Sequence, residues 1–188
     1  MTVSIPLIKK NHNLKLTGSV LLDEQNRYKL TISPEENTLL SIMRSNLQGK
    51  LLFTIEVPVQ SDNNDKHWLS FMVEGIKVKT SAQYKNHFIF NTNIKMRIFV
   101  SERLFPISTN NNESELEKKI EKQLEIAFNH LVKKIQTAEI GPMGLGLYAR
   151  AYTYQNWKPV QNKWGESLAQ ADINVKVHVK ITAMGTIK

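Results

Sequence analysis

The side chains of this sequence best suited to chemistry are carboxylates and histidines, and their spacing favours neither a catalytic nor a metal site. Four glutamates recur at every fourth position: Glu113, Glu117, Glu121 and Glu125. That spacing places them on one face of a helix, and since lysines alternate with them, the pattern is typical of a solvated helix face. The five histidines form no HExxH motif, and the sequence has no cysteine. We therefore expect no catalytic residue, no metal and no cofactor.

A glycine-rich segment, GPMGLG, spans residues 141–146. Glycines let backbone N–H groups approach an anion at a helix N-terminus, as in phosphate-binding loops. The spacing here matches neither GxGxxG nor GxxxxGK(S/T), and the segment follows a predicted helix rather than a strand. A turn between helices is the favoured interpretation. A hydrolase is a further alternative, but it would need a clustered acid and base, and the sequence offers no such pair.

Aromatic residues near the C-terminus are the candidate binding residues. The candidates for a partner-binding surface are Tyr148, Arg150, Tyr152, Trp157 and Trp164. Exposed aromatic side chains dominate the energy of many protein interfaces, and the planar guanidinium of arginine suits carbonyl or carboxylate partners. The two tryptophans are seven residues apart and can share a helix face with Val160 and Leu168, so a core role is favoured for both. Trp68 is also expected to be packed.

The net charge of the chain limits the classes of partner. Its 188 residues carry a formal net charge of +8, which favours acidic partners such as an anionic membrane surface. The basic residues occur as pairs or at alternate strand positions, so most are expected on solvated faces. No apolar run approaches the roughly 20 residues that span a bilayer. An alternative function is a basic nucleic-acid-binding module, because aromatic residues alternate with Lys and Arg from Tyr148 to Trp164.

The N-terminal part of the chain is expected to form a small subdomain over residues 1–48. Two apolar segments between Leu14 and Ile32 flank a polar turn and predict a β-hairpin. Ser33 then supplies a helix N-cap, with proline at the first helical position and Glu36 at the third, and Gly49 is expected to mark the end of this helix.

The remaining residues, 49–188, are expected to form a larger α+β domain. Alternating apolar positions predict strands over 51–59, 67–80 and 88–101, with a bulge near Gly75 where the alternation changes phase. A long helix is predicted to begin with a capping box at Ser114 and to end at Gly141, with an apolar stripe that includes Leu124 and Ala127. The last strand, 173–181, suits an antiparallel partner. The predicted fold is an antiparallel sheet of about four strands packed against this helix.

The order of residues in the C-terminal third carries a family resemblance. The pattern consists of Gln136, Gly144-Leu145-Gly146, Arg150, Trp157, Trp164 and a terminal alternating strand that ends at Gly185. Upstream, Ile5-Pro6, Gly18-Ser19-Val20 and Glu35-Glu36 agree with it. The pattern resembles the Ger(x)C family of spore germinant-receptor C subunits and covers nearly the whole chain.

The resemblance implies a noncatalytic subunit of a nutrient germinant receptor, acting in receptor assembly or signal relay. It places the protein at the outer face of the spore inner membrane, with two integral membrane subunits as partners and no nucleic acid. Family members are longer lipoproteins that are anchored through a lipid-modified cysteine, which this sequence lacks. The chain is therefore interpreted as a soluble C-terminal portion of such a protein.

Overall fold

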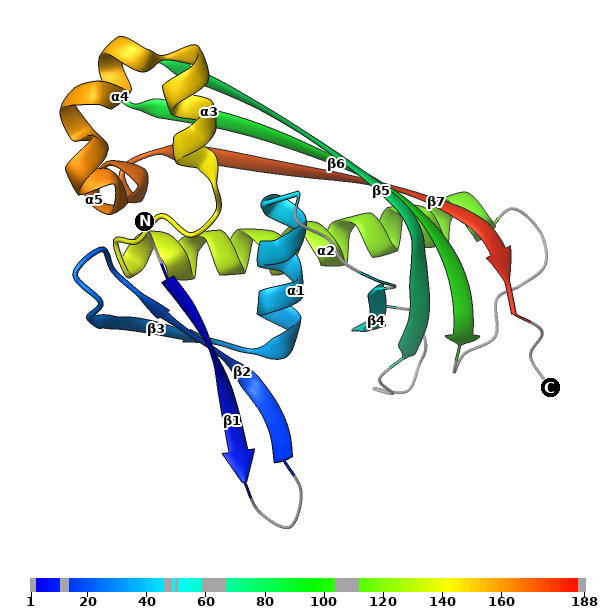
Figure 1. The fold of residues 1–188 in the computed structure, drawn as a ribbon. Helices are drawn as coiled ribbons and strands as arrows, with labels where there is room; N and C mark the ends of the chain where they lie inside the picture. The colour runs from blue at the N-terminus through cyan, green and yellow to red at the C-terminus, as the bar shows by residue number, and fades with distance from the viewer. Residues whose placement is uncertain are drawn as a thin grey trace. The chain divides into compact units, whose positions relative to one another are not determined.

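The computed structural model describes residues 3–10, 14–45, 49, 51–58, 67–103 and 112–185. Its elements, which Figure 1 labels except for η1, are β1 (Val3–Lys10), β2 (Leu14–Leu22), β3 (Tyr28–Ile32), α1 (Pro34–Met43), β4 (Leu51–Glu56), β5 (Trp68–Tyr84), β6 (Phe88–Arg103), α2 (Asn112–Thr137), α3 (Leu145–Tyr152), α4 (Tyr154–Val160), the 3-10 turn η1 (Gln161–Lys163), α5 (Trp164–Ala169) and β7 (Asp172–Met184). They form a three-stranded sheet in the order β1-β2-β3 and a four-stranded sheet in the order β4-β5-β6-β7. The predicted α+β class is confirmed.

The chain separates into two compact units, each made of several segments. Unit 1 comprises Met1–Leu47, Thr80–Thr92 and Phe128–Asn174, and unit 2 comprises Gln48–Lys79, Asn93–Ala127 and Val175–Lys188. The elements β5, β6, α2 and β7 contribute residues to both units. The division of the sequence at residue 48 into two domains stays a prediction.

In unit 1, β1, β2 and β3 form an antiparallel sheet. The hairpin predicted over residues 14–32 is therefore present, and β1 pairs with its first strand. The turn of this hairpin is built on Asp23, whose Oδ1 accepts hydrogen bonds from the N–H groups of Gln25 and Arg27, both at 2.9 Å. These two bonds satisfy backbone donors that the turn leaves without strand partners.

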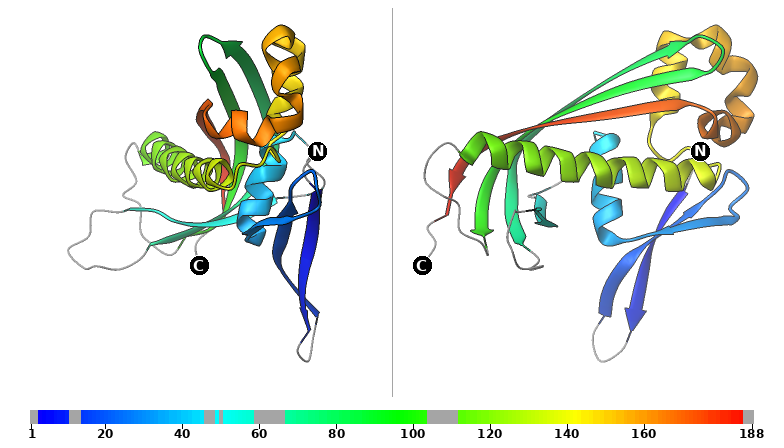
Figure 2. Two further views of the ribbon diagram at one scale, coloured as in Figure 1. Left: turned by 90° about the vertical axis from the view of Figure 1, so that its left-hand side faces the viewer. Right: turned by 180° about the vertical axis from the view of Figure 1, so that it is seen from behind.

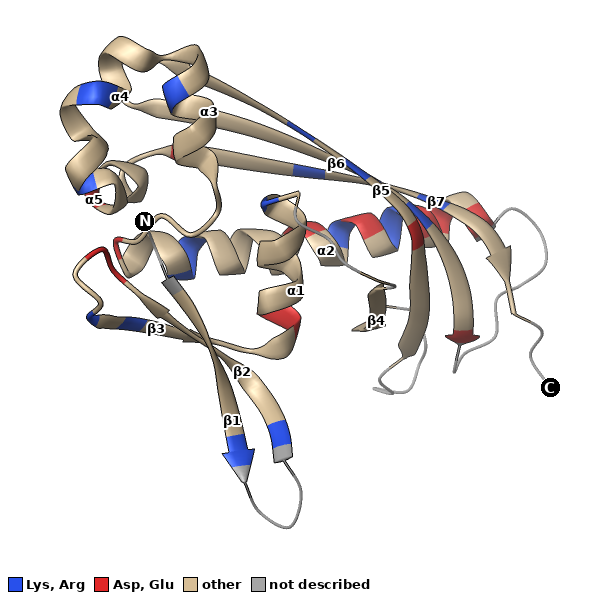
Figure 3. Ribbon diagram, viewed as in Figure 1, with Lys and Arg blue, Asp and Glu red and all other residues tan. Residues whose placement is uncertain are grey.

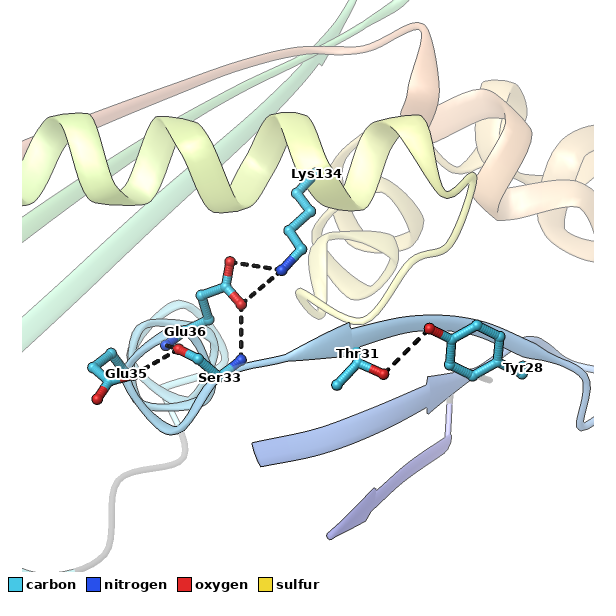
Figure 4. A network of polar contacts seen from close by, with 6 residues as sticks. All are labelled: Tyr28, Thr31, Ser33, Glu35, Glu36 and Lys134. Atoms are coloured by element: carbon cyan, nitrogen blue, oxygen red, sulfur yellow. Dashed lines mark hydrogen bonds and ion pairs between the residues drawn. The ribbon is translucent and has the colours of Figure 1, made fainter. Parts of the chain in front are cut away.

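Helix α1 begins at the predicted capping box. The Ser33 hydroxyl accepts from the Glu36 N–H at 3.2 Å, and the Glu36 carboxylate accepts from the Ser33 N–H at 2.8 Å. Figure 4 shows that the same carboxylate also meets Lys134 of α2, whose Nζ lies 2.9 Å from both oxygens. The expectation that Gly49 ends this helix is wrong, because α1 stops at Met43 and Ser45 takes the left-handed conformation, with φ of 53°.

The four-stranded sheet is mixed rather than wholly antiparallel. β4 pairs antiparallel with β5, and a short turn returns the chain from β5 into β6. β7 runs in the same direction as β6, as the arrows in Figure 1 show. In unit 2, the Thr182 hydroxyl donates to the Ile98 carbonyl and the Gly185 N–H donates to the Val100 carbonyl, so residue numbers rise together along the two strands. The expected antiparallel partner of the last strand is therefore wrong: the long α2 connection returns the chain to the starting end of β6, which makes the pairing parallel.

One face of this sheet is buried and the other is open. Ile94, Met96 and Ile98 of β6 are at most 2% exposed, and Val177 and Val179 of β7 are also buried. In β5 the buried positions are odd-numbered up to Val73, and the alternation then passes to even-numbered positions, which agrees with the predicted change of phase near Gly75.

Trp68 is 39% exposed, so the expectation that it is packed is wrong; it is the first residue of its strand. Val59 lies outside the described residues.

Helix α2 differs from its prediction at both ends. It begins at Asn112, so Ser114 lies inside its first turn and is not the N-cap. It ends at Thr137, four residues before Gly141. Two residues after this end, Glu139 adopts a left-handed φ of 53°. The apolar stripe is present, but Phe128 is fully buried where Ala127 was expected, because Phe128 follows Leu124 by four residues and continues the same face.

Of the four glutamates predicted on a solvated face of α2, Glu113 is exposed, but the other three bind β7 in unit 2. The backbone N–H groups of Val177, Val179 and Ile181 in β7 donate to the carboxylates of Glu125, Glu121 and Glu117, at 3.1, 2.8 and 2.9 Å. We call these three bonds the carboxylate ladder. β7 is an edge strand, with β6 as its one strand neighbour among the described residues. The ladder therefore satisfies donors that an open sheet edge would expose.

The ladder can form because four residues of a helix and two residues of a strand cover nearly the same length. Four residues of a helix rise about 6 Å, and two residues of a strand advance about 6.5 Å. Since α2 and β7 run in opposite directions here, successive helix turns meet alternate residues of the strand. Figure 2 and Figure 1 agree in showing the start of α2 beside the end of β7. A four-residue spacing of glutamates on the helix is thus complementary to the edge of a strand.

The core of unit 1 contains Trp164, which is 7% exposed. Its ring meets Phe88 and Phe90 of β6 edge to face, with centroids 5.2 and 6.3 Å apart. A Cβ on Gly141 would lie 2.4 Å from the indole, and one on Gly146 would lie 3.1 Å from it. These two glycines are therefore needed for the close approach of Trp164 to the turn before α3.

The predicted helix face shared by Trp157 and Trp164 is not formed. α4 ends at Val160, the 3-10 turn η1 follows, and α5 begins at Trp164 itself. Pro159 lies in the last turn of α4 and lacks the N–H group that a continuous helix requires there. The break turns Trp164 into the core and leaves Trp157 half-buried.

We predict that Glu121→Ala lowers the free energy of unfolding by about 1–3 kcal/mol, because the buried edge of β7 loses one acceptor. Glu121→Gln retains an acceptor oxygen and should cost less. The matched control is Glu115→Ala on the same helix, which breaks an exposed ion pair with Lys119 and should change stability by less than about 0.5 kcal/mol. Urea denaturation measures all three, and equal effects of Glu121→Ala and Glu115→Ala would contradict a ladder.

We predict that Trp164→Ala costs about 3–5 kcal/mol, because it empties the space between β6 and the glycine turn. Trp157→Ala should cost about 1 kcal/mol, since that ring is partly in solvent and contacts an arginine. Denaturant unfolding followed by circular dichroism separates the two. A near-wild-type midpoint for Trp164→Ala would show that the indole is not a core residue.

Candidate functional site

The candidate residues of α3, α4 and α5 fall into a surface group and one buried residue. Arg150 places its guanidinium over the ring of Trp157, 5.7 Å from the centroid, and Tyr154 lies beside the same ring at 6.1 Å. We call these three residues the arginine–aromatic cluster. Trp164 lies in the core of unit 1, so it does not contribute a surface ring.

The joint between α3 and α4 brings this cluster together. At Thr153 the backbone leaves helical geometry, and its N–H and hydroxyl groups both donate to the Ala149 carbonyl at 2.8 Å. The Thr153 carbonyl then accepts the first hydrogen bond of α4 from Trp157 at 3.0 Å. These bonds fix the bend that returns Trp157 to Arg150. Sequence reasoning selected both residues but not their contact, because the bend depends on this local geometry.

The surface around the cluster is exposed and partly apolar. Tyr152 is 67% exposed, Tyr154 is 51% exposed and Leu147 is 70% exposed, whereas Tyr148 is half-buried. None of the residues of α4, all of which the structure describes, is buried. Large exposed aromatic and aliphatic side chains next to an arginine are the composition of many protein interfaces.

Gln136, the first residue of the sequence pattern, holds α2 against α5 in unit 1. Its Nε2 donates to the carbonyls of Leu168 and Ala171, at 2.9 and 2.8 Å. These carbonyls close the C-terminal end of α5, where the helix leaves acceptors without intrahelical donors. Gln136 therefore has a structural role: it fixes the end of α5 and does not belong to the candidate surface.

A second candidate site lies on the open face of the four-stranded sheet in unit 2. It is a groove of about 570 Å³ floored by Gly75 and neighbouring strand residues. Its basic side chains are Lys77 from β5, Lys95 and Arg97 from β6, and His178 and Lys180 from β7. We call this the basic groove, and Figure 3 shows Lys and Arg positions on all three strands. Sequence reasoning noted basic residues at alternate strand positions but did not assemble them, because that requires the strand order.

Two lysines of β7, the strand at the edge of the groove, form ion pairs with glutamates of the carboxylate ladder. Lys180 Nζ lies 3.1 Å from the Glu117 carboxylate, and Lys176 Nζ lies 3.6 Å from that of Glu125. The hydrogen bond to Glu117 and its negative charge raise the pKa of Lys180. The two lysines of β7 therefore balance the glutamates that bind its backbone.

The described residues contain neither a cluster of metal ligands nor a membrane-spanning helix. Within the part of the chain that the structure describes, no three His, Asp or Glu side chains gather as a metal site would require. Among the helices described, none combines the length and the apolar character needed to cross a membrane.

Comparison with known proteins gives one family and one similar structure. The family described as "Spore germination B3/ GerAC like, C-terminal" matches residues 17–185. The crystal structure of the GerBC protein is similar in fold, with a TM-score of 0.82 at 20% sequence identity. That alignment covers 96% of this chain and 56% of the GerBC chain, so this chain spans little more than half of that protein. No curated protein matches.

The family match takes in every residue of the C-terminal pattern, from Gln136 to Gly185. It confirms the resemblance to the Ger(x)C family that the order of glycines, arginine and tryptophans indicates. The chain belongs to the spore germination B3/GerAC-like C-terminal family.

Proposed function

We propose that this chain is a noncatalytic subunit domain of a nutrient germinant receptor, acting in receptor assembly or signal relay. The observation that supports the proposal most strongly is the family match over residues 17–185. The fold shared with the GerBC protein is consistent with it. A binding role requires a stable surface rather than a reacting group, and the arginine–aromatic cluster offers one.

The partners in this proposal are the integral membrane subunits of the receptor. The contact surface is formed by Tyr148, Arg150, Tyr152 and Trp157 on α3 and α4. Trp164 acts from beneath, by holding the glycine turn from which α3 begins. Aromatic rings lose little conformational entropy on binding, and the cation–π contact already holds Arg150 in place. A partner would therefore meet a surface that is largely preformed.

The proposed location is the outer face of the spore inner membrane. In the full-length protein a lipid anchor would hold the domain there, beside its partners. Basic side chains gain about 1 kcal/mol each when they lie near an anionic membrane surface, so the net charge of +8 favours this location. Anchoring raises the effective concentration of the partners, so a contact of modest intrinsic affinity is sufficient.

We predict that Tyr152→Ala in the full-length gene slows nutrient-triggered release of dipicolinic acid from spores, because it removes an exposed ring from the contact surface. Tyrosine is enriched among the hot-spot residues whose truncation costs about 2 kcal/mol or more, so a loss of roughly tenfold or more in the response to one nutrient is expected. The matched control is Tyr28→Ala on β3, since Tyr28 is 64% exposed and Tyr152 is 67% exposed.

The spores should contain equal amounts of the variant and wild-type proteins, measured by immunoblot. If Tyr152→Ala and Arg150→Ala both leave every nutrient response unchanged, this surface is not the receptor contact. If deletion of the whole region also leaves every response unchanged, the receptor role itself is contradicted.

A further inference from the structure

The basic groove concentrates positive charge on one face of unit 2. Side chains from three neighbouring strands converge on it, because Lys95 and Arg97 alternate with the buried residues of β6, and His178 and Lys180 do the same on β7. Neighbouring strands are about 4.8 Å apart, and same-face residues along one strand are about 6.5 Å apart. The basic groups are thus close enough to act on a single ligand.

Most of this charge is not balanced by the protein. Lys180 forms an ion pair with Glu117 of the ladder. Glu74, next to Gly75, lies 2.7 Å from the Thr182 hydroxyl and adds a second negative charge beside the groove. Among the described residues, no carboxylate forms an ion pair with Lys77, Lys95 or Arg97. Like charges held together in this way repel one another, and an anion in the groove would relieve that repulsion.

Arg97 is already oriented across the groove. A Cβ on Gly75 would lie 3.5 Å from Arg97 Nε, so the guanidinium lies over the backbone of β5 rather than extending away from the sheet. A planar guanidinium binds carboxylate and phosphate groups through two parallel hydrogen bonds. The lysines on either side can add single charge-assisted bonds.

We propose that the basic groove binds a small free polyanion, a molecule with two or more carboxylate or phosphate groups. The volume of about 570 Å³ lies in the range of small-molecule sites, roughly 300–1,000 Å³. The groove is an open hollow that a compact ligand can enter, whereas the surface of a bilayer is flat. The inference goes beyond the proposed receptor role and does not depend on the surface of α3 and α4.

The test is an NMR titration of the 188-residue chain with inorganic pyrophosphate and with citrate at physiological salt. Shifts should concentrate on the amides around Lys95 and Arg97 and on the His178 ring. Lys95→Gln and Arg97→Gln should each weaken binding about tenfold, because each removes a charge-assisted hydrogen bond. The matched control is Lys79→Gln, which removes the same charge from the open face of β5 two residues beyond Lys77, outside the groove. It should weaken binding less than about twofold.

Two results would overturn the proposal. The first is no binding of pyrophosphate or citrate at about 10 mM, whether or not the chain binds phosphatidylglycerol vesicles or duplex DNA. The second is equal weakening by Lys79→Gln and Lys95→Gln, which would indicate general surface charge. The substituted side chains are exposed, so the melting temperature of each variant should match that of the wild type. Equal melting temperatures would show that a loss of affinity does not come from a loss of folded protein.

Discussion

The carboxylate ladder between α2 and β7 is the interaction on which the rest of unit 2 depends. β7 is an edge strand, and its outward N–H groups would be costly to bury without acceptors. Glu117, Glu121 and Glu125 supply those acceptors at every second strand residue. The strand held in this way buries its valines on one face and presents His178 and Lys180 on the other. The basic groove therefore exists because an acidic helix fixes the strand that forms one of its sides.

Local patterns predicted much of the fold. The capping box at Ser33, the strand alternation of β6 and the apolar stripe of α2 are consequences of neighbouring residues alone. The ladder was missed because a four-residue spacing of glutamates looks the same whether the helix face meets water or the edge of a strand. The parallel direction of β7 was missed for a related reason, since alternation of side chains is identical in parallel and antiparallel pairs. The ladder and the strand direction both depend on which distant segment of the chain the fold places next to β7.

The two tryptophans show where spacing fails as a guide to function. Seven residues would place Trp157 and Trp164 on one face of a continuous helix, but Pro159 and the turn that follows separate them. One ring then lies in the core against Gly141 and Gly146, and the other lies beneath Arg150 near the surface. Gly146 and Trp164 of the family pattern thus serve packing, while Trp157 belongs to the surface that we propose for binding. A family pattern combines both kinds of residue without distinguishing them.

Amide hydrogen exchange along β7, resolved by NMR, tests the ladder most directly. Alternate residues of this strand donate to different neighbours, so the two sets of amides report separately on the sheet and on the helix. If the ladder forms, Val177, Val179 and Ile181 are protected as strongly as Lys176, His178 and Lys180. If Val177, Val179 and Ile181 exchange at the rate of open amides while the other three remain protected, the carboxylates do not bind the strand and this account of unit 2 is wrong.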